Sequence, residues 1–245
     1  MREYFELYKD ILCSNNLSDY CTDEIIDNLY RAQVEIIEKN EHLNLTAIKV
    51  NEDFIAKHWA DSLKIVKYVP QNAKVLDVGT GGGILALAIA ISRKDVTVTA
   101  LDSTEKKIAF VNELSEKLQI KNLSAISCRA EEYGHSESRE SYDFVCARAV
   151  ADLPVLCELC IPLVKKNGLF VSLKGKSGSE ELERAKKAYE TLGCKLIATD
   201  NSPLIEKSNG ECTNSERFVF VFKKEKMTPK EYPRHYSKIS KSPIN

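Results

Sequence analysis

One short stretch, residues 74–83, constrains the fold of this chain more than any other. An apolar run ends in an acid at Asp77, four glycines follow within the five residues 79–83, and a second apolar run begins at Ile84. A strand, a glycine turn and a helix in this order bring backbone N–H groups and a helix N-terminus against a nucleotide-like ligand. The stretch therefore predicts a nucleotide-type binding site in a domain that mixes strands and helices.

The chain from residue 73 onward alternates between strand and helix patterns. In chain order, the predicted elements are strand 74–78, helix 83–92, strand 96–102, helix 104–118, strands 123–128 and 142–147, helix 153–164, strand 168–174 and helix 179–192. Such alternation predicts βαβ units and a mostly parallel sheet with right-handed crossovers. A last pair of strands, 194–199 and 217–222, is joined by a loop at 200–216 without a helix, which indicates an antiparallel end strand.

Three regions follow from these patterns. Residues 1–70 repeat apolar side chains at helical spacing and predict a helical segment packed on the main domain, which spans 71–223. Residues 224–245 form a basic tail; from Lys223 onward there are seven Lys/Arg and two Glu, interleaved with tyrosines and prolines. This composition suits phosphate contacts and base stacking, or a solvated chain end.

Composition narrows the class of protein. The net charge of −1 gives no electrostatic case for nucleic-acid binding by the whole chain, so only a local basic patch would serve. The N-terminus lacks a signal-peptide pattern, and no apolar run approaches the roughly 18 residues that span a bilayer. The eight cysteines are scattered, and Cys157 and Cys160 have no second pair. We therefore expect structural thiols, no metal site, no membrane partner and a cytoplasmic location, and we expect a monomer.

Side chains around the first two strand ends narrow the ligand. Asp77 precedes the turn, where a carboxylate accepts from a ligand amine or braces loop amides. Asp102 ends the next strand, where a doubly wound sheet places an acid for both ribose hydroxyls, or where it caps the following helix. Gly79, Gly81 and Gly83 stand at alternate positions, and the turn has no basic residue. This arrangement favours S-adenosylmethionine (SAM) over the pyrophosphate of a dinucleotide.

Three further side chains belong to the same predicted sheet edge, and each has an alternative role. Glu131, after the third strand, would accept from an adenine amine or would be a surface acid. Arg148, after the fourth strand, would clamp a carboxylate or phosphate, or would pair with Asp143 or Asp152. Lys174 ends the fifth strand and would contact a phosphate or lie in solvent.

Motifs over most of the chain resemble those of the glucose-inhibited division protein B family, the guanine-N7 methyltransferases of small-subunit ribosomal RNA. The residues that carry this resemblance are Asn44-Leu45-Thr46, His58 with Asp61-Ser62-Leu63, Asp77 to Gly83, Asp102-Ser103 with Lys106-Lys107, Arg129-Ala130-Glu131, Tyr142-Asp143, Arg148-Ala149, Lys174-Gly175 and Tyr232-Pro233-Arg234. The resemblance implies a class I SAM-dependent methyltransferase with a Rossmann-like α/β fold and a helical N-terminal extension. It also implies 16S ribosomal RNA, or the small ribosomal subunit, as the partner.

The resemblance also implies positions for the site. The cofactor contacts, together with those expected from the turn itself, fall on Gly79, Ile84, Ala130, Glu131, Arg148, Asp77, Gly81 and Asp102. RNA contacts are expected at Arg148, Lys174 and Arg234. This chain has Ile84-Leu85-Ala86 where the family usually has Phe-Pro-Gly. We therefore expect a plainer helix start and an aliphatic wall at Ile84.

The expected chemistry needs no catalytic acid or base. Guanine N7 has a lone pair and no proton, so its attack on the SAM methyl group depends on placement. Three alternatives stay open: a SAM-dependent methyltransferase of a small molecule or protein, a nicotinamide-dependent oxidoreductase, and a non-catalytic RNA-binding assembly factor. The glycine spacing disfavours the oxidoreductase. The assembly factor is supported in the sequence by Ile84-Leu85-Ala86, which replaces the usual Phe-Pro-Gly of the family.

Overall fold

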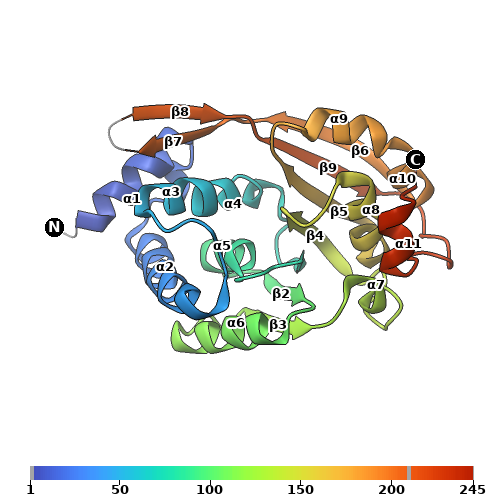
Figure 1. Ribbon diagram of the computed structural model, residues 1–245, viewed down its shortest axis with the longest axis horizontal. Coiled ribbons are helices and arrows are strands. Elements are labelled where there is room, and N and C mark those ends of the chain that lie inside the picture. The colour runs from blue at the N-terminus through green and yellow to red at the C-terminus, as the bar shows by residue number, and fades with distance from the viewer. Residues whose placement is uncertain (1–2, 209–210, 245) are drawn as a thin grey trace.

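A seven-stranded sheet forms the centre of the computed structural model, which describes residues 3–208 and 211–244 (Figure 1). The strand order is β3-β2-β1-β4-β5-β9-β6. The strands are β1 (Lys74–Val78), β2 (Thr97–Asp102), β3 (Leu123–Ser127), β4 (Tyr142–Arg148), β5 (Val164–Lys174), β6 (Cys194–Asn201) and β9 (Phe218–Lys224). Strands β1 to β5 pair in parallel, and β9 runs antiparallel to both β5 and β6. The predicted mostly parallel sheet with an antiparallel last strand is confirmed.

Helices cover both faces of this sheet and create two apolar cores. One core contains Val75, Val98 and Phe144 and joins the sheet to the N-terminal helices, α5 (Ile84–Ser92) and α6 (Glu105–Lys117). The other contains Leu76, Val145 and Phe222 and joins the opposite face to the helices that follow β3, β4 and β5. These helices are α7 (Ala130–Tyr133), α8 (Leu153–Cys160), α9 (Gly178–Arg184) and α10 (Lys186–Thr191). Because alternate residues of a strand point to opposite faces, the apolar runs of β1 and β4 supply both cores.

The N-terminal segment is helical and lies against α5. In chain order, its first elements are α1 (Glu3–Ser14), a 3-10 turn (Ser18–Tyr20) and α2 (Asp23–Leu43). A continuous helical stretch follows, made of α3 (Asn51–Phe54), a π-helical turn (Ile55–Ala60) and α4 (Asp61–Leu63), and a second 3-10 turn (Val66–Tyr68) ends the segment. Helix α2 is capped by Thr22, whose hydroxyl accepts a hydrogen bond from the Ile25 N–H at 3.3 Å. The segment positions residues 44–61 beside the glycine turn.

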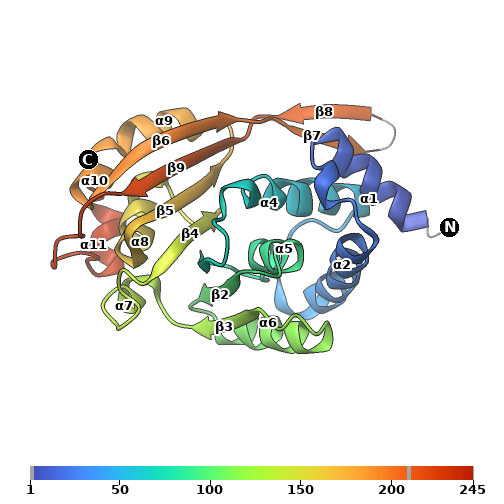
Figure 2. The same ribbon diagram turned by 180° about the vertical axis from the view of Figure 1, so that it is seen from behind.

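The sequence-based prediction differs from the structure at the expected loop 200–216. This segment contains an antiparallel hairpin, β7 (Leu204–Ser208) and β8 (Glu211–Ser215), which extends over α1 (Figure 2). The Asn15 side chain fixes it by donating to the Ile205 carbonyl and accepting from the Ile205 N–H, both at 2.9 Å. The hairpin was missed because these partners are 190 residues apart in the chain.

The structure also differs from the prediction at two helices and at the start of one strand. The helix predicted at 153–164 ends at Cys160, and a 3-10 turn (Ile161–Leu163) containing Pro162 leads directly into β5. Proline has no N–H to continue a helical ladder, which explains the early end. Strand β5 consequently begins at Val164, four residues before the predicted start at 168. The helix predicted at 179–192 is divided into α9 and α10.

The tail folds back onto α8 and ends in α11 (Tyr236–Lys241) (Figure 1). Ile239 of α11 is fully buried in the second core. The Arg139 guanidinium donates to the carbonyls of Thr228, Pro229 and Tyr232, at 2.7 to 3.2 Å. Within the described ranges, no helix is long and apolar enough to cross a membrane.

Candidate active site

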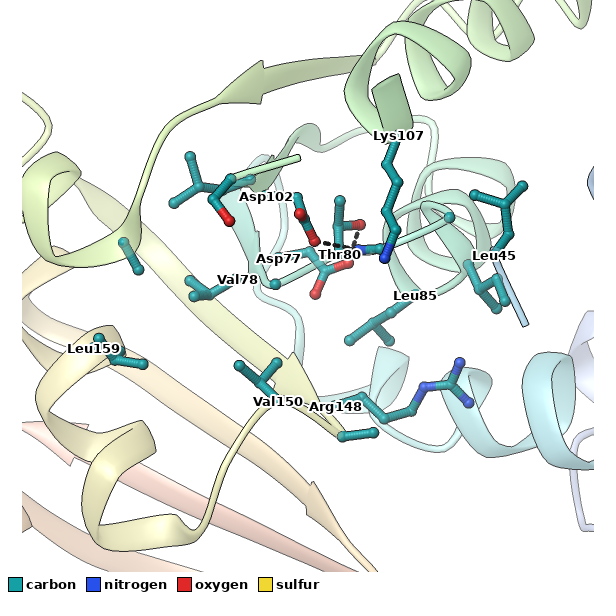
Figure 3. Close-up of a pocket in the computed structure, with 18 of the residues that line it drawn as sticks. Leu45, Asp77, Val78, Thr80, Leu85, Asp102, Lys107, Arg148, Val150 and Leu159 are labelled. Carbon is teal, nitrogen blue, oxygen red and sulfur yellow. Dashed lines mark hydrogen bonds between the residues drawn. The ribbon is translucent and has the colours of Figure 1, made fainter. Parts of the chain in front are cut away.

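A cavity of about 600 Å³ opens where β1, β2 and β4 end at their carboxyl edges (Figure 3). In an open α/β sheet this edge is where ligands bind. Most residues that line the cavity come from five segments: 45–48 of the N-terminal region, the glycine turn within 77–85, the β2 end within 101–107, and the segments 128–131 and 148–150; His58, Leu159 and Tyr236 complete the lining. All eight residues predicted to contact the cofactor lie in this lining.

The glycine turn holds a backbone geometry that requires glycine. Gly79, Gly81 and Gly83 have φ values of 71°, 57° and 80°, a region that side chains other than glycine rarely adopt. The N–H groups of Gly79 and Thr80 both donate to the Leu101 carbonyl, at 2.8 and 3.0 Å, which fastens the turn to β2. A Cβ atom at Gly79 would lie 2.5 Å from a methyl carbon of Val150. Gly79, Gly81 and Gly82 line the cavity, so the turn presents backbone atoms there without side chains that would fill the space.

The Asp77 side chain at the end of β1 holds the turn through a hydrogen bond. One carboxylate oxygen accepts from the Thr80 hydroxyl at 2.6 Å, and the side chain is buried. Burial raises the pKa of Asp77 to about 6, against the opposing effect of the Thr80 hydrogen bond. Asp77 can brace the turn and also accept from a ligand amine, because an ionised carboxylate has about four acceptor sites and Asp77 lines the cavity.

Asp102 joins the turn to the following helix. Its Oδ2 accepts from the Gly81 N–H and its Oδ1 from the Thr104 N–H, both at 2.9 Å. Asp102 therefore does hold the N-terminal end of α6, which is close to the capping role predicted as its alternative. Each oxygen keeps a further lone pair and Asp102 lines the cavity, so the same carboxylate can also receive ribose hydroxyls.

Part of the cavity lining is apolar. Ala130 begins α7 shortly after β3 and lines the cavity together with Val150 and Leu159. Glu131 is only 7% exposed, which excludes the alternative of a surface acid. A buried acceptor beside an apolar slot suits the exocyclic amine of a purine. Ile84 begins α5 and forms part of the aliphatic wall, as predicted from the departure at 84–86.

Arg148 has partners different from those expected. It donates to the Lys57 carbonyl at 2.8 Å and forms an ion pair with Asp61 at 3.4 Å. Asp61 is 5% exposed and also pairs with Arg217 at 3.1 Å. The expected acids are occupied elsewhere: Asp143 pairs with Lys165, and Asp152 with Arg184. The predicted alternative pairing was wrong in its partners, because a spacing along the chain does not identify a contact between distant segments.

A second cavity of about 480 Å³ adjoins the first and shares Ile48, His58, Arg148 and Ala149 with it. Its cationic side chains are Lys57, Arg148, Lys174 and Arg217, against the acids Asp61 and Glu181. It is therefore a polar chamber beside the glycine turn, and all four of its cations have acidic partners, since Lys57 pairs with Asp53 and Glu206 outside the lining.

Two of the residues expected to contact RNA have internal partners. Lys174 is 8% exposed, pairs with Glu181 at 2.7 Å and donates to the Ala151 carbonyl. The Arg234 guanidinium holds the buried Glu158 through bonds of 2.8 and 2.6 Å. This geometry favours internal roles for both side chains, and their RNA contacts stay predictions.

Several lining residues were not singled out as ligand contacts from the sequence, and four of them carry polar groups that can reach a ligand. They are Thr46, Thr80, Lys107 and Tyr236. Lys107 extends from α6 over the glycine turn (Figure 3). Thr46 and Lys107 stand within motifs of the family resemblance, which was the available signal. Thr80 is a turn residue whose hydroxyl role depends on the backbone geometry, and Tyr236 reaches the cavity only because the tail folds back.

The sheet order, the glycine turn and the acid at the end of β2 define a Rossmann-like methyltransferase. Among solved structures, the chain is similar to M. jannaschii TYW2 in complex with AdoMet, with a TM-score of 0.56 and 17% identity over 74% of this chain and 81% of that one. At this identity the likeness concerns the fold.

The sequence comparisons identify the family. Residues 26–203 match the family GidB, rRNA small subunit methyltransferase G. The chain is 42% identical to the ribosomal RNA small subunit methyltransferase G of Acetivibrio thermocellus, over 91% of this chain and 90% of that protein. It is 45% identical to the protein of the same name from Bacillus subtilis, over 85% and 86%. The chain belongs to the GidB family of ribosomal RNA small subunit methyltransferases.

Proposed function

We propose that this protein transfers the methyl group of SAM to N7 of a specific guanine in 16S ribosomal RNA. The observation that carries the proposal is one cavity lined together by the open glycine turn, Asp102 and the buried Glu131, in a member of this family. The proposal implies a cytoplasmic location, and a monomeric state stays a prediction.

The residues around the first cavity fit SAM part by part. Ala130 and Glu131 would hold the adenine, and Asp102 the ribose hydroxyls. The open backbone of the turn and the Asp77 carboxylate would hold the methionine portion and its ammonium group. The turn carries no lysine or arginine for a pyrophosphate, which favours SAM over a dinucleotide. SAM supplies an electrophilic methyl group on a sulfonium.

The second cavity provides a place for the target base. It adjoins the first cavity at Arg148 and His58. RNA phosphate would compete with Asp53, Glu206 and Asp61 for Lys57 and Arg217. A guanine in a loop, or extruded from a helix, would enter from this side. A small molecule or protein substrate is the main alternative, and membership of the family of ribosomal RNA methyltransferases disfavours it.

The protein contributes placement to the reaction. N7 needs no base, so the residues act by aligning the base with the methyl group, which can lower the barrier by about 7–11 kcal/mol. The positive charge of the SAM sulfonium moves to the guanine ring in this reaction. Burial and Arg148 lower the pKa of His58 to about 3, so this histidine stays neutral at the cavity wall.

The direct test is methyl transfer from labelled SAM to naked 16S ribosomal RNA and to small subunits, followed by mass mapping of the modified nucleotide. We expect one methylated guanine with the label at N7, and loss of the label with Asp102→Asn. Calorimetric titration with SAM and with NAD separates the remaining alternatives. SAM binding without RNA methylation would indicate a different substrate or an assembly factor, and NAD binding would indicate the oxidoreductase.

A further inference from the structure

The basic tail is fastened to the domain by buried polar contacts. Glu158 of α8 is fully buried and accepts from Arg234 three times, from its N–H, its Nε and its Nη2, at 2.6 to 2.8 Å. A buried carboxylate is stable only when it is paired and hydrogen-bonded. Arg234 is therefore committed to holding the tail in place.

Residues next to α7 fix the tail at further points. Arg139 donates to three carbonyls of residues 228–232, and His135 forms a 2.7 Å hydrogen bond with the Pro233 carbonyl. Beyond this point, Ile239 anchors α11 in the second core. The chain on both sides of Tyr236 is thus held by contacts to the main domain.

This arrangement brings Tyr236 to the cofactor cavity. Its side chain lines the cavity together with Ala130 and Leu159 and is 39% exposed. Helix α11 lies beside α8, the helix that carries Leu159, in both views of the fold (Figures 1 and 2). Tyr236 is therefore on the side of the cavity where the adenine is expected. No part of the tail was assigned to cofactor binding from the sequence.

We propose that Tyr236 closes the adenine end of the SAM site, with its ring packed against the adenine, and that Arg234 is a positioning residue for it. This inference rests on the proposed SAM site. Stacking of a base on an aromatic side chain changes affinity roughly 5- to 150-fold. The tail would then act in cofactor binding, in place of the RNA stacking expected from its composition.

The test uses the full-length protein without RNA and measures SAM and 5′-methylthioadenosine binding by calorimetry. We expect Tyr236→Ala to weaken both ligands by the same factor, at least about fivefold, because both contain the adenine. Tyr236→Phe should stay within about twofold of wild type, because the ring makes the contact. Met227→Ala is the matched control, since Met227 is an exposed tail side chain outside the cavity lining.

A second arm tests positioning by Arg234. Arg234→Ala should weaken SAM binding in protein that is still folded, and the double variant with Tyr236→Ala should bind no worse than Tyr236→Ala alone. Additive losses would show that Arg234 acts by another route. Unchanged SAM affinity in Tyr236→Ala, or an equal loss in Tyr236→Phe, would overturn the inference. Wild-type protein that binds no SAM would overturn the proposed function as well.

Discussion

Arg148 donates a hydrogen bond to His58, with 3.3 Å between Nη2 and Nδ1. A guanidinium has only donors, so Nδ1 must be the acceptor, and the proton of the neutral ring is on Nε2. Nε2 then donates to the Thr46 hydroxyl oxygen, 2.7 Å away. This chain of contacts connects β4, the π-helical turn and the segment that covers the glycine turn, and it requires a neutral histidine.

The first prediction concerns stability as a function of pH. The pKa of His58 falls from its usual 6.5 to about 3 in the folded protein, so below pH 6.5 the unfolded state takes up the proton first. The stability present above pH 6.5 is therefore lost as the pH falls. By pH 5 the loss amounts to at most about 2 kcal/mol. Urea denaturation at pH 7.5 and 5.0 measures it.

The matched variants for this measurement are His58→Gln and His42→Gln. His58→Gln should remove this part of the pH dependence, whereas His42→Gln should behave like the wild type, because His42 is exposed at the end of α2. Equal pH dependence in wild type and His58→Gln would contradict the assignment.

The second prediction concerns SAM binding and Asp77. Because burial raises the pKa of this carboxyl to about 6, it is largely protonated at pH 5 and ionised at pH 7. The ionised form attracts the SAM ammonium group, so SAM affinity should rise between pH 5 and 7 and level off by pH 7.5. Calorimetry across this range is the measurement. Asp77→Asn should bind SAM about tenfold more weakly at pH 7.5 and show a flat profile; a rising profile in that variant would contradict the role of Asp77.

The third prediction concerns the shape of the glycine turn. Gly79→Ala would place a methyl group 2.5 Å from Val150 at a φ of 71°, so it should destabilise the fold by about 1–3 kcal/mol and weaken SAM binding. Gly175→Ala is the control, because its Cβ would meet no atom within 4 Å and its φ is not in the left-handed region. Adding Val150→Ala should restore part of the stability of Gly79→Ala. No recovery would mean that backbone strain, and not the contact, dominates.

The contrast between the glycine turn and Arg148 shows what the sequence could predict. The turn, Asp77 and Asp102 are local features, because the strand, the positive φ values and the backbone contacts involve residues close in the chain or on neighbouring parallel strands. The parallel sheet follows in the same way from alternating patterns. Arg148 and Asp61 are 87 residues apart, and Asn15 and Ile205 are 190 apart. No periodicity records such pairs, so the second cavity and the hairpin emerged only in three dimensions.

The tail shows that amino-acid composition alone does not predict the charge that a segment exposes. Its basic residues and tyrosines are typical of an RNA-binding segment, yet two of its charges are neutralised internally: Arg234 by Glu158, and Lys224 by Glu140. The buried acids lie in other segments and carry no signal in the sequence of the tail. Charge counted along a segment therefore overestimates the charge that a partner meets.

The last prediction uses this difference to separate the two roles of Arg234. Arg234→Ala leaves Glu158 buried without its partner, so the free energy of unfolding should fall by about 3–5 kcal/mol. Arg184→Ala breaks a pair of similar chemistry in which Arg184 is 56% exposed, and it should cost less than about 1 kcal/mol. Denaturant unfolding measures both variants. Restored stability in Arg234→Met combined with Glu158→Leu would confirm that the cost comes from the unpaired charge. An Arg234→Ala protein with wild-type stability and weakened RNA binding would instead support the RNA contact predicted from the sequence.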